Sequence, residues 1–256
     1  MENEKKTFTG MKENHIEGRN AVLEAFRSGR TIDKLYVLDG CQDGPVRSIT
    51  REARKHDTIV NYVTKERLDQ ISETGKHQGV IAVSAAYDYA RVEDILALAE
   101  KKGEPPFILI LDGIEDPHNL GAIIRTANQA GAHGVIIPKR RAVGLTPTVA
   151  RTSAGAVNYV PVAKVTNISN TMKELKNRGM WFVCADMDGT LMYDMDLTGP
   201  IGLVIGNEGD GVSPLVKKNC DMVASIPMKG DIDSLNASVA AGVLLYEIVR
   251  QRMKKG

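Results

Sequence analysis

Four polar side chains that could take part in chemistry lie close together in the sequence: Asp116, His118, Asn119 and Arg125. A carboxylate, an imidazole, an amide and a guanidinium can hold a polar ligand, orient a substrate or move a proton. Arg125 stands in an otherwise apolar stretch, so its guanidinium must reach solvent, pair with an acid or contact a ligand. We expect it to contact a ligand, with Glu208 as a candidate ion-pair partner that would hold it in place.

Two of these residues have ordinary structural alternatives. Asn119 opens a predicted helix and could serve as no more than its N-cap. His118, the usual first candidate for acid–base chemistry, is interpreted here as a turn residue. The stretch therefore predicts a site in which Asn119 and Arg125 matter most.

The same polar character appears after three predicted strands. An apolar run at 107–111 precedes the first polar stretch, and apolar runs also precede the segments 206–214 and 226–236. Each segment is rich in glycine and small polar residues and leads into a predicted helix. Ligands bind outside the carboxyl ends of the strands in open α/β sheets. We therefore expect the three segments to form one site.

Glycines and helix caps are competing interpretations of the later two segments. Gly206, Gly209 and Gly211 would let the backbone approach a ligand, but they also suit a plain tight turn. Ser234 or Asn236 could simply cap the final helix. Neither the dinucleotide-binding G-x-G-x-x-G spacing nor a P-loop occurs, which argues against both kinds of nucleotide site.

The order of predicted elements indicates an α/β protein with two domains. In the first half, helices are expected at 18–29, 45–55 and 65–71, and strands at 33–39, 58–63 and 79–84. In the second half, strands are expected at 107–111, 134–137, 157–160, 180–185, 201–205 and 222–226, and helices at 119–130, 168–178, 213–219 and 235–252. Continuous apolar strands are typical of a parallel sheet covered on both faces.

Domain boundaries are predicted from composition and from Gly and Pro residues that interrupt regular structure. Residues 1–13 are expected to be a disordered tail and 14–88 an N-terminal domain. A helical piece ending in Gly and followed by two prolines makes 89–104 the expected linker. The remaining residues, 105–256, form the second domain.

Composition limits the possible functions. The 256 residues carry a net charge of +1, which argues against strong nonspecific binding of nucleic acid but leaves room for a local basic face. Basic residues gather at 47–55 and 139–141, where a solvated surface is an equal explanation. The three cysteines have no metal-ligand or disulfide spacing. With no apolar run of about 20 residues and no secretory signal, we expect a cytoplasmic protein without a membrane or a metal.

A second motif invites a different function. Asp186 and Asp188 follow an apolar strand in a D-x-D-G-T sequence that resembles the nucleophile motif of haloacid-dehalogenase-type phosphatases. Too little chain follows for the rest of such a domain. A turn at 188–189 is the preferred interpretation.

Taken in order, the three polar segments resemble the motifs of the SpoU (TrmH-like) family of RNA 2′-O-ribose methyltransferases. The matching residues are Asn119, Gly121 and Arg125, then Gly206, Asn207, Glu208 and Gly209, then Pro227, Ser234, Leu235 and Asn236. Residues 15–25 and 77–82 resemble the N-terminal RNA-binding domain of one subgroup, the RlmB type. That subgroup methylates a guanosine in 23S rRNA, and its N-terminal domain is similar to small α/β ribosomal proteins.

The resemblance implies a fold, a cofactor and a set of roles. The second domain should be a parallel SPOUT sheet with a deep trefoil knot, and it should act as a homodimer whose site is completed across the interface. S-adenosylmethionine should bind in the knot, held largely by backbone groups. The implied cofactor residues are Gly206, Ile226, Leu235, Asn207 and Met228, and the implied catalytic residues are Arg125, Asn119, Glu208, Ser234 and Asn236.

The expected activity is S-adenosylmethionine-dependent 2′-O-methylation of a ribose, that of a guanosine in 23S rRNA. A tRNA ribose 2′-O-methyltransferase is one alternative. A non-catalytic RNA-binding factor for ribosome assembly is another, and the phosphatase comes third.

Overall fold

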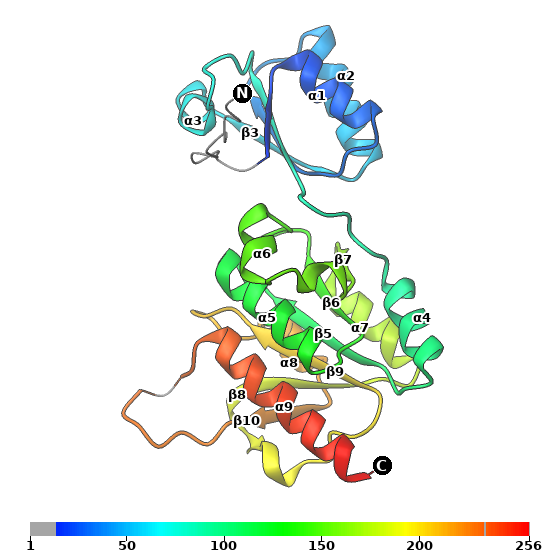
Figure 1. The fold of residues 1–256 in the computed structure, drawn as a ribbon. Helices are drawn as coiled ribbons and strands as arrows, with labels where there is room; N and C mark the ends of the chain where they lie inside the picture. Colours follow the sequence, from blue (N-terminus) through cyan, green and yellow to red (C-terminus); the bar gives the residue numbers. More distant parts are fainter. Residues whose placement is uncertain (1–13, 233, 256) are drawn as a thin grey trace, which may run out of the picture. The chain divides into compact units, whose positions relative to one another are not determined.

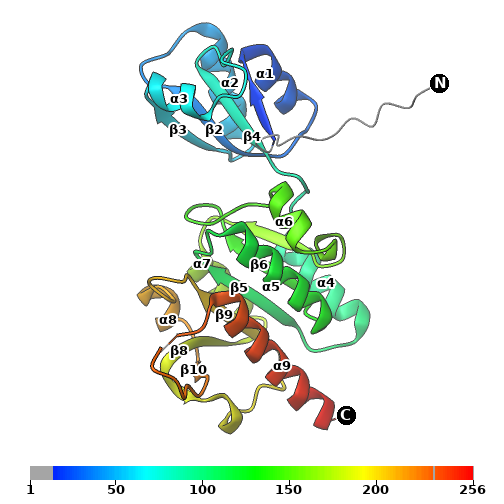
Figure 2. The same cartoon turned by 60° about the vertical axis from the view of Figure 1, so that its left-hand side comes forward.

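The computed structural model describes residues 14–232 and 234–255, which form two compact units (Figures 1 and 2). The first unit contains the described residues through Asp88 together with Leu145–Pro147. The second contains Tyr89–Gly144 and the described residues from Thr148 onward. The tail predicted at 1–13 lies outside the described residues.

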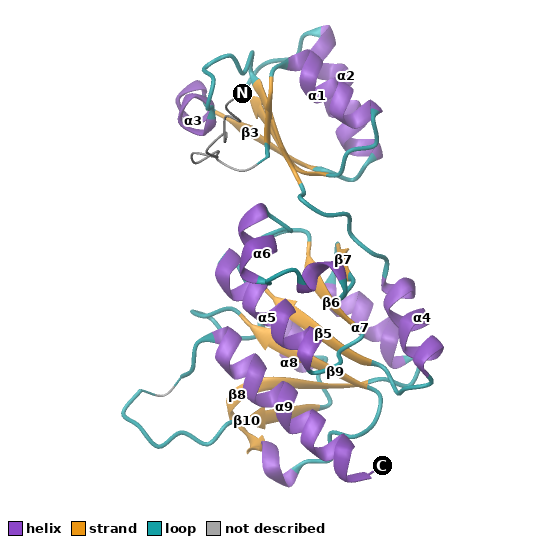
Figure 3. Cartoon of the chain, in the orientation of Figure 1, coloured by secondary structure: helices purple, strands orange, loops and turns teal. Residues whose placement is uncertain are grey.

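The first unit is a four-stranded mixed sheet with three helices (Figure 3). Its elements are β1 (His15–Glu17), α1 (Arg19–Arg27), β2 (Ile32–Leu38), α2 (Gly44–Lys55), β3 (Ile59–Val63), α3 (Lys65–Ile71) and β4 (Val80–Ser84). The strand order is β1-β4-β2-β3, and β2 and β3 run parallel while the other pairs are antiparallel. β3 is therefore an edge strand, with one side free of strand partners among the described residues.

Side-chain caps mark the start of two helices of this unit, α2 and α3. The Asp43 side chain accepts a hydrogen bond from the Val46 amide, and Pro45 occupies the first turn of α2. The Thr64 hydroxyl caps α3 in the same way. Such caps satisfy amides that have no partner inside the helix.

The second unit is built on a sheet of six strands that all run parallel. Its elements are α4 (Val92–Lys102), β5 (Phe107–Asp112), α5 (Pro117–Gln129), β6 (Gly134–Pro138), α6 (Pro147–Thr152), η1 (Ala156–Asn158), β7 (Val162–Val165), α7 (Ile168–Lys176), β8 (Trp181–Leu191), η2 (Met192–Asp194), β9 (Ile201–Gly206), α8 (Pro214–Lys218), β10 (Met222–Ser225) and α9 (Ala237–Lys255). The strand order is β10-β8-β9-β5-β6-β7. The predicted α/β class and parallel sheet are confirmed.

Helices cover both faces of this sheet. Side chains of α4, α7 and α8 share a buried core with alternate residues of β5, such as Ile108 and Ile110. α5 and α9 lie side by side on the other face (Figure 1). Burial on both faces explains why β5 and β9 read as continuous apolar runs. The expected trefoil knot concerns chain threading, which strand order does not decide, and it stays a prediction.

The segment predicted as a linker, 89–104, is part of the second unit. Ile95 of α4 is fully buried among the core side chains of β5, β6 and α7. Gly134 makes room for it, because a Cβ atom there would lie 2.5 Å from an Ile95 carbon. The Gly and Pro residues thus mark the end of a core helix, and the units divide between Asp88 and Tyr89.

Several local elements differ from the sequence-based expectation. Residues predicted as a strand at 157–160 form the short 3₁₀ helix η1 and its continuation, and the strand begins at Val162, after Pro161. Tyr159, in that segment, is 75% exposed. α6 and β1 are too short to give a periodic signal and were not predicted.

β8 continues through the sequence that was expected to turn at 188–189. Its pairing with β10 jumps from Cys184 opposite Val223 to Thr190 opposite Ala224, so the residues between Cys184 and Thr190 bulge out of register. Gly189 permits this, because a Cβ atom there would lie 2.5 Å from the Val223 carbonyl oxygen. The D-x-D-G-T sequence therefore forms a bulge inside one long strand. Across the described residues of both units, no helix is long and apolar enough to cross a membrane.

Candidate active site

One side chain joins the three polar segments. Asn119 lies in the first turn of α5 and is only 8% exposed. Its amide nitrogen donates to the Glu208 carboxylate, and its Oδ1 accepts a hydrogen bond from Nδ2 of Asn236 at 3.1 Å. The segments that follow β5, β9 and β10 therefore meet at Asn119, as their positions after the strands predicted.

The cap of α5 is a different residue from the one considered in the sequence. Asp116 is the N-cap and accepts a hydrogen bond from the His118 amide at 2.8 Å, while Pro117 begins the helix. Asn119 is consequently free to use both ends of its amide across the site. His118 lies in the first turn of α5 rather than in a loop turn before the helix, and its side chain is exposed.

The glycine-rich segment forms a closed turn at the end of β9. The backbones of Asn207 and Gly211 exchange two hydrogen bonds of 3.1 Å, and Asn207 Oδ1 accepts from the amides of Gly209 and Asp210. A Cβ atom on Gly206 would lie 2.0 Å from the Gly211 carbonyl carbon. Gly206 is therefore needed for the turn itself. The turn presents Glu208 to Asn119.

Two residues that the sequence analysis passed over hold this edge of the sheet together. Asp112, at the end of β5, accepts a hydrogen bond from the Ser213 amide at 2.8 Å and so ties β5 to the start of α8. Gly113 has a φ of +87°, and a Cβ there would lie 3.5 Å from the Asn207 side chain. An Asp-Gly pair directly after a buried strand was the signal available for both.

Gly121 serves the packing of the site. A Cβ atom on Gly121 would lie 1.8 Å from the Thr152 hydroxyl oxygen, so α5 and α6 can cross closely only with glycine here. The Thr152 hydroxyl lies 3.3 Å from the Pro117 carbonyl oxygen, at the start of α5. This first-motif residue thus fixes the helix that carries Asn119 and Arg125.

Asn236 has two partners at once. Its Oδ1 accepts from the amide of Ser238 at 2.9 Å, which makes Asn236 the cap of α9, while its Nδ2 binds Asn119. Ser234 is exposed and makes no hydrogen bond within the described residues. Of the two cap candidates, Asn236 is the one in place.

The segment from Ile226 to Leu235 has the character of a surface that receives a ligand. Its described residues make no backbone hydrogen bond among themselves or to the other described residues. Met228 and Leu235 are each 38% exposed, and Ile226 is half-buried. The segment thus offers backbone donors and acceptors beside apolar side chains.

Arg125 lies two turns into α5 and is exposed. The expected ion pair with Glu208 is absent from the described residues, since the Glu208 carboxylate accepts from Asn119 instead. Nothing in the described part of the chain pairs with the Arg125 guanidinium, which leaves all of its donors available to an anionic ligand.

The structure gives the phosphatase alternative no support. The Asp186 carboxylate forms an ion pair of 2.6 Å with Lys217, and this contact holds the pKa of Asp186 below its ordinary value. Among the described residues there is also no group of His, Cys, Asp and Glu side chains that could hold a metal ion. The polar side chains that meet are those of Asn119, Glu208 and Asn236, which lie in other segments.

The family is decided by comparison with known proteins. Residues 106–246, more than half of the chain, match the SpoU rRNA Methylase family. This chain is a SpoU methylase. Residues 15–90 also match the family described as RNA 2′-O ribose methyltransferase substrate binding. The substrate-binding match covers most of the first unit, and the SpoU match covers the second unit from residue 106, after α4.

Bacterial relatives match the SpoU chain over nearly its whole length. YacO of Bacillus subtilis, named as a TrmH family tRNA/rRNA methyltransferase, is 49% identical over 94% of this chain and 97% of its own. A similarly named protein of Staphylococcus saprophyticus is 46% identical over the same shares.

Solved structures share the fold. AviRb of Streptomyces viridochromogenes, a SpoU methyltransferase in complex with AdoMet, has a TM-score of 0.60 and 28% identity over 94% of this chain and 90% of its own. An AdoMet-bound rRNA methyltransferase of Sinorhizobium meliloti has a TM-score of 0.58 and 26% identity over 93% of this chain and 87% of its own. A TrmH/SpoU tRNA modifying enzyme of A. aeolicus has a TM-score of 0.55 and 33% identity over 64% of this chain and 85% of its own.

These findings establish the activity at the level of the family. The SpoU protein is an RNA 2′-O-ribose methyltransferase that binds an RNA substrate through its N-terminal unit. The AdoMet-bound relatives support S-adenosylmethionine as its methyl donor. Which class of RNA it modifies is a separate question.

Proposed function

We propose that this SpoU protein methylates the 2′-hydroxyl of a guanosine in 23S rRNA. The observation that carries the proposal is the union of a substrate-binding unit with a SpoU unit whose three motifs meet at Asn119. The S. meliloti rRNA enzyme is matched over nearly all of this chain, including the substrate-binding unit. The A. aeolicus tRNA enzyme is matched over a smaller share, 64%.

The cofactor would lie between the second and third segments. Gly206 and Asn207 would contribute from the turn after β9, and Ile226, Met228 and Leu235 from the segment before α9. The unused backbone groups of that segment support this assignment. S-adenosylmethionine supplies an electrophilic methyl group bonded to a positively charged sulfur.

Arg125 would hold the RNA. A guanidinium makes paired, charge-assisted hydrogen bonds to a phosphate. The exposed Arg125 donates to no carboxylate among the described residues. Arginine does not lose its proton in proteins, so Arg125 would orient the phosphate and the 2′-oxygen rather than act as a base. The 2′-oxygen forms the new bond to carbon as the carbon–sulfur bond breaks. The hydroxyl proton passes to the phosphate or to water.

Asn119, Glu208 and Asn236 would position the reactants, with Ser234 beside them. Positioning can supply up to about 7–11 kcal/mol of the barrier reduction in favourable cases. Asn119 fixes the relative places of the two loops that frame the cofactor, and Glu208 and Asn236 are its anchors. Ser234 has no partner among the described residues and is available to contact a ligand.

We further propose that the SpoU unit forms a homodimer through α9. Val239, Tyr246 and Met253 recur at intervals of seven residues, so they share one face of this helix. They are 50%, 51% and 78% exposed, which is unusual for an apolar row. Light scattering during size-exclusion chromatography should give twice the chain mass, and Tyr246→Glu should give the monomer.

The substrate is tested directly with labelled cofactor. Purified protein is incubated with radiolabelled S-adenosylmethionine and, separately, undermodified 23S rRNA, 16S rRNA or tRNA. Label confined to a guanosine ribose in 23S rRNA is expected. Label in tRNA would replace the proposal with the tRNA enzyme, which the A. aeolicus similarity favours. RNA binding without transfer would indicate an assembly factor.

A further inference from the structure

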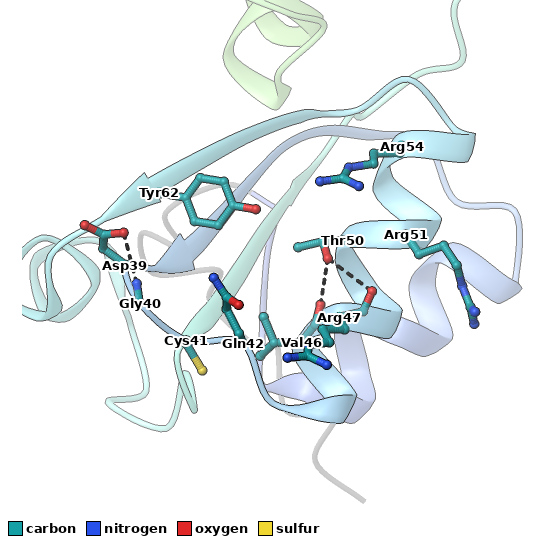
Figure 4. A pocket seen from close by; sticks show the side chains of 10 residues that line it. All are labelled: Asp39, Gly40, Cys41, Gln42, Val46, Arg47, Thr50, Arg51, Arg54 and Tyr62. Atoms are coloured by element: carbon teal, nitrogen blue, oxygen red, sulfur yellow. Dashed lines mark hydrogen bonds between the residues drawn. The ribbon is translucent and has the colours of Figure 1, made fainter.

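The first unit contains a cleft between α2 and the edge strand β3 (Figure 4). Its volume is about 520 Å³, within the range of roughly 300–1,000 Å³ usual for small-molecule sites. The turn after β2 closes one end. The cleft therefore has room for a nucleotide, and its lining can be compared with what a nucleotide would need.

Positive charge lines the helical wall. Arg47, Arg51 and Arg54 are all exposed and occur at helical spacing along α2. Within the described residues, none of their guanidinium groups has a hydrogen bond or an ion pair. By contrast, Lys55 of the same helix pairs with Glu52 at 2.8 Å and does not line the cleft. The lining arginines are thus the ones that keep their donors for a ligand.

An aromatic ring forms the opposite wall. Tyr62 of β3 is 55% exposed, and its ring extends over the cleft toward Arg54 (Figure 4). An exposed ring on an edge strand offers one flat face to a partner. Unpaired nucleobases stack on such rings, and the contact tolerates any base because every base has a flat face.

The closed end of the cleft is polar and partly acidic. Gln42 and Asp39 lie there, and Asp39 uses one oxygen to accept a hydrogen bond from the Gly40 amide at 2.9 Å. Its other oxygen remains for a donor. A carboxylate repels a free anion such as inorganic phosphate, but it can accept from the N–H groups of a base edge.

We infer that this cleft binds an unpaired nucleotide of the RNA substrate. The base stacks on Tyr62 with its edge toward Asp39 and Gln42, and the adjoining phosphates contact Arg54 and Arg47. Arginines at one wall, a ring at the other and an acid at the end fit a nucleotide better than an acidic peptide, which would have no use for the acid. The inference deepens the proposed function, because it rests on the first unit binding RNA.

The test uses the full-length protein and a fluorescent single-stranded RNA of mixed sequence, with binding followed by anisotropy. Tyr62→Ala should weaken binding roughly 5- to 150-fold, the range expected for one lost base stack. Tyr62→Phe keeps the ring and should bind like the wild type. Arg54→Gln should weaken binding. It should also reduce the slope of log affinity against log salt concentration by about one, because one phosphate contact is lost.

Arg27→Gln is the matched control, because Arg27 is an exposed arginine of α1 outside the cleft. It should change affinity less than about twofold if bulk charge alone does not drive binding. Thermal unfolding of each variant checks that the unit folds. An RNA duplex of the same length should bind less tightly than the single strand and should be insensitive to Tyr62→Ala.

The results separate this inference from the proposed function. If the wild type methylates 23S rRNA while folded Tyr62→Ala and Arg54→Gln bind and methylate RNA like the wild type, the cleft is not the binding site and the inference fails alone. If the wild type methylates no RNA, the proposed function fails, and the binding series still decides the role of the cleft. Equal losses in Arg27→Gln and Arg54→Gln would also overturn the inference.

Discussion

Oδ1 of Asn119 and Nδ2 of Asn236 form a hydrogen bond of 3.1 Å that joins residues 117 positions apart. The other end of the Asn119 amide binds Glu208, 89 positions away. An amide can do both because it carries a donor and an acceptor on one planar group. The site is therefore built around a connection between loops rather than around a single reactive group.

Replacing Asn119 should disconnect the loops. We expect Asn119→Ala to lower kcat/KM for RNA methylation about 10- to 100-fold, since small misplacements of reactants cost about that much. His118→Ala, one residue earlier and exposed, should stay within about threefold of the wild type. Steady-state methylation with labelled cofactor measures both. Wild-type kinetics in folded Asn119→Ala would contradict the proposed positioning role.

Replacing Arg125 should lower turnover without changing the stability of the fold. Because its guanidinium is exposed and has no partner among the described residues, Arg125→Ala should change the free energy of unfolding by less than about 0.5 kcal/mol. Turnover should fall about 100-fold or more while S-adenosylmethionine affinity, measured by calorimetry, stays nearly constant. Arg125→Lys should recover part of the activity, because it keeps the charge but loses the planar fork. Near-wild-type turnover in Arg125→Ala would remove Arg125 from the mechanism.

Gly206 and Gly209 lie in one turn but should respond differently to alanine. A Cβ atom on Gly206 would lie 2.0 Å from the Gly211 backbone, whereas the nearest atom to a Cβ on Gly209 is 3.5 Å away. Gly206→Ala should destabilise the protein by about 1–3 kcal/mol and abolish cofactor binding, as overpacking does elsewhere. Gly209→Ala should be tolerated. Thermal unfolding and cofactor calorimetry on both variants test the contrast, and equal tolerance would argue against the closed turn.

Glu17 makes the first unit sensitive to acid. Burial raises the pKa of Glu17, but hydrogen bonds from Thr74, the Glu73 amide and Ser72 outweigh it and lower the pKa from 4.5 to about 2. A carboxyl group with a lowered folded pKa stabilises the fold above its unfolded pKa, and this contribution disappears as the pH falls through the folded pKa. The loss therefore falls between pH 4.5 and about 2.

Hydrogen exchange can isolate this effect. The Glu73 amide, which donates to Glu17 at 2.5 Å, should be better protected in the wild type than in Glu17→Gln above pH 4.5. The difference in protection should shrink as the pH approaches 2. A difference that stays constant with pH would show that the ionised carboxylate is not what holds the loop.

Two truncations should distinguish the observed boundary from the predicted one. Deleting residues 1–88 leaves α4 in place, and this protein should fold, bind S-adenosylmethionine and fail to methylate rRNA. Deleting residues 1–104 also removes Ile95 from the core of the second unit. Loss of a buried isoleucine alone costs about 2–5 kcal/mol, so the shorter protein should aggregate or melt earlier. Equal thermal stability would contradict the place of α4 in that core.

The sequence predicted the second unit well because its physical signals agree. Continuous apolar runs such as 107–111 and 201–205 are typical of strands buried on both faces of a parallel sheet, and polar residues that follow such strands lie along one edge. Asn119, Glu208 and Asn236 follow three such strands, and the hydrogen bonds between them confirm that they lie together. The sequence could not show which side chain would join them, since that depends on side-chain angles at the ends of separate strands.

The errors have physical causes as well. Gly103 and Pro105 end a helix whether or not a domain boundary follows. Their positions therefore could not show that Ile95 packs into the core of the second unit. Charge alone favoured an ion pair between Arg125 and Glu208, but a carboxylate also accepts from an amide, and Asn119 is the partner it has. Val157 and Val160 are buried, as the apolar pattern suggested, but Val157 lies in a short 3₁₀ helix and Val160 in the bend after it, not in a strand.

The distances along the chain between Asn119, Glu208 and Asn236 set an order of events during protein synthesis. The first unit is nearly complete once residue 88 has left the ribosome, whereas the last partner of Asn119 is residue 236, followed by all of α9. Domains generally fold as units during synthesis, the N-terminal one first. A growing chain therefore completes the unit that matches the substrate-binding family before it completes the site around Asn119, and chains that stop early would have the first without the second.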